Sequence, residues 1–361
     1  MAVYSGAGSL NKLLNEIKYL NYHTIMVVTG RTSFDKSGLK DLLLSELNGS
    51  ELVFFSNFSP NVKFEESYAG ILKSKGCGAD AILAIGGGSV IDMAKTISLT
   101  PESEKELEHV ILGQAKIQST LPLFCAPTTA GSGSEATHFA VIYMNGKKYS
   151  LADQKLFPQS VAIDPQLSAS MPPYLTACSG FDALSQAVES YWAQGATDQS
   201  RVYAAKAINL ILPSLEKAVT EQTPEIREKM ALGAHYAGKA INISKTTAPH
   251  ALSYYLTSTY GIPHGHAVAI FTGLFFKINQ SEIPERLYAL MACPSAETCC
   301  DTWYKMMSRC GLEPSMQKLG IPEAECKKIL DYVNLDRLKN NPANPKKEIL
   351  LQQLLKFYST I

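Results

Sequence analysis

The first third of the chain alternates short apolar runs with stretches whose apolar residues recur at helical spacing. Four runs are typical of buried strands: residues 23–29 (HTIMVVT), 51–55 (ELVFF), 81–85 (AILAI) and 121–126 (LPLFCA). Helical spacing marks residues 10–19, 65–75 and 90–100. Strands that alternate with helices predict right-handed crossovers and a mostly parallel sheet.

The pattern changes along the rest of the chain. Residues 139–143 and 148–151 flank Asn145-Gly146, a pair that suits a type I′ turn, so we expect a β-hairpin there. After Pro172-Pro173, helical patterns dominate at residues 180–192, 200–219, 225–243 and 251–260. We therefore predict an α/β domain over residues 1–170 and an all-helical domain over residues 171–361, with a substrate cleft between them.

Length, charge and cysteine content narrow the function classes. A chain of 361 residues exceeds the usual limit of one core, which favours two domains. Because Lys+Arg and Asp+Glu are both 33, we expect neither a nucleic acid nor a membrane as partner. No apolar run reaches the ~18 residues of a spanning helix, and the first residues do not resemble a secretory signal. The eight cysteines form no CxxC pair, which favours reduced thiols and a cytoplasmic location.

Two loops rich in small residues follow predicted strands. Residues 86–89 (GGGS) precede a helix that begins near Val90, and adjacent glycines let a ligand approach the free N–H groups of a helix N-terminus. This is neither a GxGxxG nor a Walker motif, so a tight turn without a ligand remains an alternative. Residues 127–135 (PTTAGSGSE) form the second loop. Two such loops at the carboxyl ends of parallel strands favour a dinucleotide.

The helical half contains candidate metal ligands. Asp182 and Gln186 lie four residues apart on a predicted helix and share one face. His250 and His264 lie on either side of residues 261–263 (GIP), which interrupt the helical pattern just before His264. Two imidazoles and a carboxylate can hold a divalent cation and leave a position open for an alcohol or carbonyl oxygen, although a structural histidine pair is the alternative. His266 would point the same way as His264 in an extended segment and would diverge in a helix.

Several segments carry a family resemblance, and they stand in a fixed order. They are GAGSL (residues 6–10), GGGSVIDMAK (86–95), PTTAGSGSE (127–135), the Lys148 segment, FDALSQAVES (181–190), PHALSYYLTSTYGIPHGHAVAI (249–270) and LKNNPANP (338–345). Together they resemble the iron-containing (group III) alcohol dehydrogenases over essentially the whole chain. The resemblance implies a Rossmann-like domain, a helical metal-binding domain, a homodimer, and hydride transfer between NAD(P)H and a metal-bound small alcohol or aldehyde.

The resemblance also assigns roles to individual positions. Those that would cradle the cofactor's pyrophosphate are Gly86, Gly87, Gly88 and Ser89. Those that would contact the rest of the cofactor are Asp92, Thr128, Thr129 and Ser132, with Lys148 beside its ribose. The implied ligands of the metal, Fe²⁺ or Zn²⁺, are Asp182, Gln186, His250 and His264.

Two positions depart from the family pattern. Gln186 stands where the family usually has histidine, and an amide oxygen is a harder and weaker ligand, so zinc loses part of its preference. Tyr254 stands where histidine is often found. Tyr254 can donate a hydrogen bond, but a phenol of pKa about 10 is a poor base near neutrality. We expect the proton to reach the alkoxide through water or the ribose hydroxyls, with help from His266.

The end of the first predicted strand bears on the choice of cofactor. NAD-preferring relatives have an acidic residue there, whereas this chain has Gly30 and Arg31. Gly30 leaves room for a 2′-phosphate and Arg31 can pair with it, which favours NADPH slightly. A solvated loop charge is the alternative for Arg31.

The substrate is predicted from the segment around the first histidine. Residues 243–257 (ISKTTAPHALSYYLT) resemble the phosphonoacetaldehyde reductase branch most closely. A phosphonate needs cationic or N–H donors, for which Lys245 is the best candidate, with Thr246, Thr247 and His266 as helpers. A branch that oxidises the terminal hydroxyl of an eight-carbon sugar acid would use the same lysine. A non-redox lyase of the dehydroquinate synthase type and a catalytically silent relative remain as alternatives.

Overall fold

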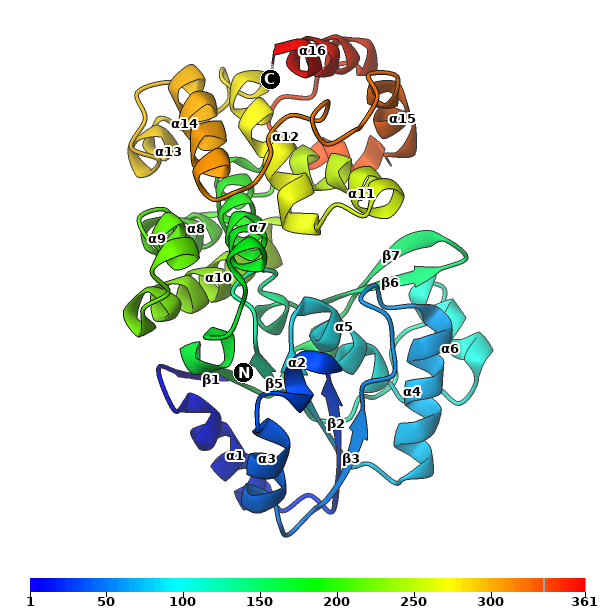
Figure 1. Cartoon of the computed structure of the whole chain (residues 1–361). Helices are drawn as coiled ribbons and strands as arrows, with labels where there is room; N and C mark the ends of the chain where they lie inside the picture. The colour runs from blue at the N-terminus through cyan, green and yellow to red at the C-terminus, as the bar shows by residue number, and fades with distance from the viewer. Residues whose placement is uncertain (334, 361) are drawn as a thin grey trace. The chain divides into compact units, whose positions relative to one another are not determined.

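The computed structural model describes residues 1–333 and 335–360, which form two compact units (Figure 1). The first unit contains Met1–Thr129 and Gly133–Ala169. The second contains Ala130–Ser132 and the chain from Ser170 onward. Each unit is built differently, the first around a sheet and the second from helices.

A six-stranded sheet forms the centre of the first unit. Its strands are β1 (Ala2–Ser5), β2 (Thr24–Thr29), β3 (Glu51–Phe55), β4 (Ala81–Gly86), β5 (Leu123–Pro127) and β8 (Ser160–Ile163). Their order is β1-β8-β5-β4-β2-β3, and every pair is parallel, which confirms the predicted mostly parallel sheet. The central strands β2 and β4 are buried throughout, as their continuous apolar runs indicate.

Helices flank this sheet. They are α1 (Ser9–Leu20), α2 (Thr32–Asp35), α3 (Leu39–Glu46), α4 (Phe64–Gly76), α5 (Gly88–Ile97) and α6 (Glu104–Ile111). Helix α1 buries Leu10, Leu13, Leu14 and Ile17, which follow the spacing of an amphipathic helix. These residues share one apolar cluster with the residues of β2 and β4 that face them. This packing holds the carboxyl ends of the strands in fixed positions.

The predicted β-hairpin is confirmed. Strands β6 (Phe139–Met144) and β7 (Lys147–Ala152) pair antiparallel and form a separate two-stranded sheet. The two turn residues have positive φ angles, 52° at Asn145 and 71° at Gly146. These are the angles that a type I′ turn requires, and an Asn-Gly pair adopts them at little cost.

The second unit is helical, as predicted. Its helices are α7 (Pro173–Trp192), α8 (Asp198–Ile211), α9 (Leu215–Thr220), α10 (Pro224–Ser244), α11 (Ala248–Tyr260), α12 (His264–Ile278), α13 (Glu285–Leu290), α14 (Ala296–Arg309), α15 (Glu325–Tyr332) and α16 (Lys347–Thr360). Helix α7 is buried along most of its length and packs against α8, α10 and α12. Among the helices that the structure describes, none has the length and apolar character needed to cross a lipid bilayer.

One predicted helix is wrong in its extent. Residues 200–219 were expected to form a continuous helix, but α8 ends at Ile211 and α9 begins at Leu215. Pro213 lies in the gap. A proline has no backbone N–H and its ring clashes with the preceding helical turn, so the helix stops before it.

A close approach between α12 and α7 depends on one glycine. A Cβ atom added at Gly265 would lie 1.9 Å from the carbonyl oxygen of Cys178 and 2.9 Å from the Cβ of Asp182. The first contact is with helix backbone, which cannot move away as a flexible side chain can. The start of α12 therefore lies directly against α7 only because residue 265 has no side chain.

We expect Gly265→Ala to destabilise the protein by about 3 kcal/mol, because overpacking forces the two helix backbones apart. The free energy of unfolding from urea titration measures this effect. Gly76→Ala is the matched control, because a Cβ at Gly76 meets no atom within 4 Å. Its effect should be a small stabilisation of about 0.5 kcal/mol. Equal stability of the two variants would show that the contact is not tight.

Candidate active site

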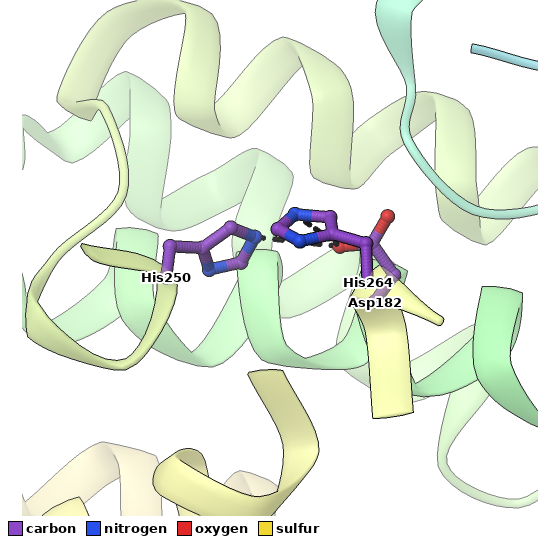
Figure 2. A group of neighbouring side chains, drawn as sticks. All are labelled: Asp182, His250 and His264. Carbon is purple, nitrogen blue, oxygen red and sulfur yellow. Dashed lines mark ion pairs between the residues drawn. The ribbon is translucent and has the colours of Figure 1, made fainter. Parts of the chain in front are cut away.

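Three side chains from distant parts of the sequence converge in the second unit (Figure 2). Asp182 comes from α7, His250 from α11 and His264 from α12. One potential ligand atom of each lies within 4.8 Å of the others. From Oδ1 of Asp182, Nε2 of His250 is 3.3 Å away and Nε2 of His264 is 4.0 Å away. Asp182 and His250 are buried, whereas the His264 side chain is 36% exposed, so solvent reaches the group from the side of His264.

The ends of the helices bring these residues together. His250 lies in the first turn of α11, and His264 is the first residue of α12. The connection between the two helices is short, and Gly261 ends α11 with a φ of 67°. This positive φ favours glycine and turns the chain back sharply. The turn and the close packing at Gly265 place both imidazoles beside the same turn of α7.

The chemistry of this group fits a divalent cation. Nε2 of His250 is buried and has no hydrogen-bond partner in the described structure. An orphaned buried nitrogen beside a carboxylate is what a metal ligand offers before the ion is bound. Burial alone raises the pKa of the Asp182 carboxyl, but the ion pair with Nε2 of His250 and the charge of His264 outweigh it and lower the pKa. Asp182 is therefore ionised near neutrality.

The electrostatics of His250 lead to the same conclusion. Burial lowers its pKa, but the Glu189 and Asp182 carboxylates on its two sides more than compensate and raise the pKa to about 10. Two buried carboxylates around a single imidazole create a strong demand for positive charge. A divalent cation ligated by Nε2 would satisfy that demand.

Gln186 lies next to this group, one helical turn after Asp182. Its amide Nε2 donates a hydrogen bond to Oδ1 of Asp182 over 3.2 Å, and its Oε1 is buried without a partner. A rotation of the amide by half a turn would direct the oxygen towards Asp182. Two oxygens would repel each other there unless a cation lay between them. The role of Gln186 as fourth ligand stays a prediction, and it requires this rotation.

His266 is engaged elsewhere. Because α12 begins at His264, the side chain two residues later diverges from it. Nε2 of His266 lies 2.8 Å from the backbone carbonyl of Glu313, and its Nδ1 lies 3.2 Å from the hydroxyl of Tyr174. Burial lowers the pKa of His266. Both ring nitrogens are therefore occupied, and this geometry does not support its predicted help in proton transfer.

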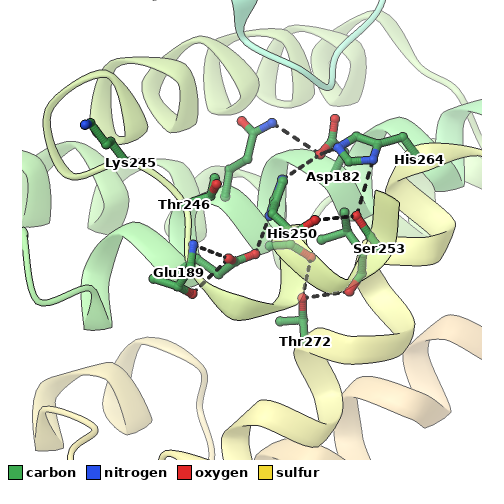
Figure 3. Close-up of polar contacts among 12 residues, drawn as sticks. Asp182, Glu189, Lys245, Thr246, His250, Ser253, His264 and Thr272 are labelled. Atoms are coloured by element: carbon green, nitrogen blue, oxygen red, sulfur yellow. Dashed lines mark hydrogen bonds and ion pairs between the residues drawn. The ribbon is translucent and has the colours of Figure 1, made fainter. Parts of the chain in front are cut away.

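Tyr254 and Lys245 have different relations to the group. The ring of Tyr254 stacks on His264, with centroids 5.5 Å apart and planes 6° apart, so it covers one face of that imidazole. Lys245 is exposed, and Figure 3 shows its amine pointing away from Asp182, His250 and His264. Its backbone has φ 63° and ψ 175°, a strained conformation for a residue other than glycine. The structure does not bring the Lys245 amine to the candidate metal ligands.

The first unit brings the two small-residue loops together. Gly86 ends β4, and α5 begins at Gly88. The N–H of Thr128 donates to the carbonyl of Gly86 over 3.0 Å, and a Cβ at Gly87 would lie 3.2 Å from Cγ2 of Thr129. The free N–H groups at the start of α5 thus lie beside the Thr128–Thr129 loop, an arrangement suited to a pyrophosphate. Ser132 belongs to the second unit.

A buried lysine that the sequence did not single out holds the second loop. Nζ of Lys95 donates to the backbone carbonyls of Ser134, Thr137 and Phe139 over 2.7, 2.7 and 2.6 Å. Asp92 accepts a hydrogen bond from the Ser134 hydroxyl. Burial lowers the pKa of Lys95 and raises that of Asp92. The carboxylate of Asp92 is therefore used within the unit. In the sequence, the position of Lys95 among the apolar residues of the 86–95 segment was the one sign that this lysine would be buried.

Arg31 lies at the same edge of the sheet as the glycine turn. It follows Gly30 at the end of β2, and β2 pairs with β4. Its Nε donates to the carbonyl of Ser56 over 3.0 Å, and its Nη2 donates to Oδ1 of Asn57 over 2.6 Å. Both partners follow β3. The guanidinium is therefore fixed at the carboxyl ends of β2 and β3, where it remains exposed.

A parallel sheet with a glycine turn, together with a helical unit that gathers a carboxylate and two imidazoles, is typical of metal-dependent dehydrogenases that use a nicotinamide cofactor. Comparison with known families agrees. Residues 1–165 match the family model "Iron-containing alcohol dehydrogenase", and residues 176–358 match "Fe-containing alcohol dehydrogenase family, C-terminal". The chain belongs to the iron-containing alcohol dehydrogenase family and is an oxidoreductase, as its resemblance implied.

Individual relatives extend over most of the chain. Alcohol dehydrogenase 4 of Saccharomyces cerevisiae (strain YJM789) is 31% identical over 300 residues, which cover 81% of this chain and 75% of the relative. The NADPH-dependent butanol dehydrogenase of Clostridium saccharobutylicum is 29% identical, with coverage of 92% and 88%. The solved structure of sulfoacetaldehyde reductase from Bifidobacterium kashiwanohense in complex with NAD⁺ is 30% identical, covers 100% of this chain and 98% of its own, and has a TM-score of 0.93.

We expect Gln186→His to tighten binding of Zn²⁺ at least tenfold, because imidazole is a better ligand for this ion than an amide oxygen. Competition with a coloured chelator measures the affinity. Gln194→His is the control, since Gln194 lies just beyond the end of α7 and is exposed. An unchanged affinity in Gln186→His would mean that residue 186 does not reach the ion.

Proposed function

We propose that this protein is an NAD(P)H-dependent aldehyde reductase or alcohol dehydrogenase that acts on a small anionic aldehyde. In this proposal Asp182, His250 and His264 hold a divalent cation, with Gln186 as the fourth ligand. The observation that carries it is the buried Nε2 of His250, which makes no hydrogen bond in the described structure and lies 3.3 Å from Oδ1 of Asp182. When bound, the cation supplies Lewis-acid polarisation of the substrate oxygen and the nicotinamide supplies the hydride.

The residues of the chain itself bind and orient these groups. The start of α5, with Gly86, Gly87, Gly88 and Ser89, receives the pyrophosphate of the cofactor, and Lys148 lies beside its ribose. Tyr254 covers a face of His264 and restricts the access of water to it. Since both nitrogens of His266 have partners, we infer that the proton reaches the product oxygen from water or from a ribose hydroxyl. The predicted homodimer also stays part of this proposal.

The substrate class is supported by a relative and by local sequence. The solved neighbour with 30% identity is a sulfoacetaldehyde reductase, which by its name acts on a two-carbon aldehyde bearing a sulfonate. A phosphonate is also a tetrahedral oxyanion, and it needs similar cationic and N–H donors. Phosphonoacetaldehyde is therefore the substrate that we propose, and Lys245 is the proposed cation. This lysine can serve only if its flexible side chain turns back from the direction seen in Figure 3.

The activity is tested by mixing the metal-loaded protein with NADPH and either phosphonoacetaldehyde or propanal, and following absorbance at 340 nm. We expect kcat/KM for the phosphonate to be at least tenfold higher, a difference of about 1.4 kcal/mol in transition-state binding. Asp182→Asn should abolish turnover of both aldehydes. No oxidation with either aldehyde would contradict the proposed function, and equal rates would contradict the anionic substrate.

Two replacements of Lys245 separate its charge from its backbone. Lys245→Ala and Lys245→Gly both remove the amine, but glycine also relieves the strained backbone. If the amine binds the phosphonate, both variants lose the preference for the anionic aldehyde equally, and only Lys245→Gly gains thermal stability. A preference that survives in both variants would assign the anion to other donors.

The choice of cofactor depends on Arg31 in this proposal. We expect Arg31→Ala to raise KM for NADPH about tenfold and to leave KM for NADH nearly unchanged, because only NADPH carries a 2′-phosphate. Steady-state kinetics with both cofactors measure the effect. Lys12→Ala, which removes an exposed charge from α1, is the control. Equal changes for both cofactors would show that Arg31 does not recognise the phosphate.

A further inference from the structure

Glu189 is a fully buried carboxylate on the same helix as Asp182. The two residues are seven positions apart, which places them on one face of α7 about two turns apart. A carboxylate in an apolar helical core is costly unless several donors compensate its charge. The hydrogen bonds that Glu189 accepts come from the segment that contains His250.

Each oxygen of this carboxylate has its own partners (Figure 3). Oε1 accepts a hydrogen bond from Nδ1 of His250. Oε2 accepts from the backbone N–H of Thr247 over 2.7 Å and from its hydroxyl over 2.9 Å. Thr247 immediately precedes α11, so the carboxylate lies at the N-terminus of this 13-residue helix, where the free N–H groups and the helix dipole favour negative charge.

These contacts fix the state of the His250 ring. Because both oxygens of Glu189 accept hydrogen bonds, Nδ1 keeps its proton, and Nε2 is the ring nitrogen whose proton a cation would replace. Nε2 is the ring atom that is buried without a partner, 3.3 Å from Oδ1 of Asp182. Glu189 thus selects the tautomer, orients the ring and adds a second negative charge behind the ligand.

We propose that Glu189 is a positioning residue for the metal, which acts through His250 to set the affinity for the cation. The inference rests on the proposed function, because it requires a metal at Asp182, His250 and His264. Carboxylates behind ligating histidines raise metal affinity by about 10–100-fold.

A purely structural role is the competing explanation. Glu189 also connects α7 to the start of α11. The Thr247 hydroxyl, which donates to Glu189, accepts a further hydrogen bond from the indole N–H of Trp192 over 3.0 Å. Loss of this connection would lower stability but would leave the metal affinity of the folded protein unchanged. Stability and affinity must therefore be measured on the same variants.

The test compares Glu189→Gln with the wild type in competition titrations of Co²⁺ and Zn²⁺ against a coloured chelator. Glutamine keeps the shape, but when its oxygen accepts from Thr247 its NH₂ group faces His250. The ring then accepts on Nδ1, whereas a ring ligated through Nε2 must carry its proton on Nδ1, where it would face a second donor. We expect affinity to fall 10–100-fold and the visible absorption bands of bound Co²⁺ to change.

Ser190→Ala is the matched control. Ser190 is the next residue of α7, is buried, and accepts a hydrogen bond from the hydroxyl of Ser244 over 2.7 Å without touching the ligands. This variant loses a buried hydrogen bond of similar kind, so its stability should fall while its metal affinity stays that of the wild type. Equal affinities in Glu189→Gln, Ser190→Ala and wild type would overturn the positioning role.

Two further results keep the inference separate from the proposed function. If the wild type binds neither ion stoichiometrically, the metal site itself is wrong. If Glu189→Gln does not fold, ¹⁵N NMR of the Zn²⁺-loaded wild type decides instead. A proton that remains on Nδ1 of His250 supports the proposal, and a proton on Nε2 refutes it.

Discussion

The structure of the helical unit depends on one electrostatic constraint, the burial of the Asp182 carboxylate inside an apolar core. A buried charge is tolerated only when the attraction to its partners offsets the free energy that is lost when it leaves water. Two imidazoles face it, and they come from the first turns of α11 and α12. The short connection between these helices and the missing side chain of Gly265 allow both imidazoles to reach α7. The need to compensate the buried carboxylate of Asp182 thus shapes both the packing of the helices and the chemistry of the site.

The first unit solves a similar problem with the opposite charge. Lys95 is fully buried, and three backbone carbonyls compensate its ammonium group. Because these carbonyls belong to the segment after β5, the lysine fixes the path of the chain next to the glycine turn. In both units a buried charge orders the chain beside a candidate binding site, and apolar packing alone would give less directional control.

Much of the fold could be predicted because its signals are local. The buried strands β2 and β4 are continuous apolar runs, and Asn145-Gly146 determines its own turn. Strands β1 and β8 have only four residues each, too few for a periodic pattern, and they are strands because they pair with each other. The grouping of Asp182, His250 and His264 was predicted from spacing and resemblance. The contacts of Glu189 were not, since they depend on where α11 begins.

The charge balance of the proposed metal site is compatible with glutamine at position 186. Asp182 and the buried Glu189 contribute two carboxyl groups to the proposed site, one on each side of His250. Glutamine and histidine are both neutral ligands, so exchanging them leaves this balance unchanged and alters only the softness of the fourth ligand. Removing either carboxylate would instead leave an excess charge in a buried site. In the proposed site the electrostatic part of metal binding would therefore reside in Asp182 and Glu189, and residue 186 would adjust which ion is preferred.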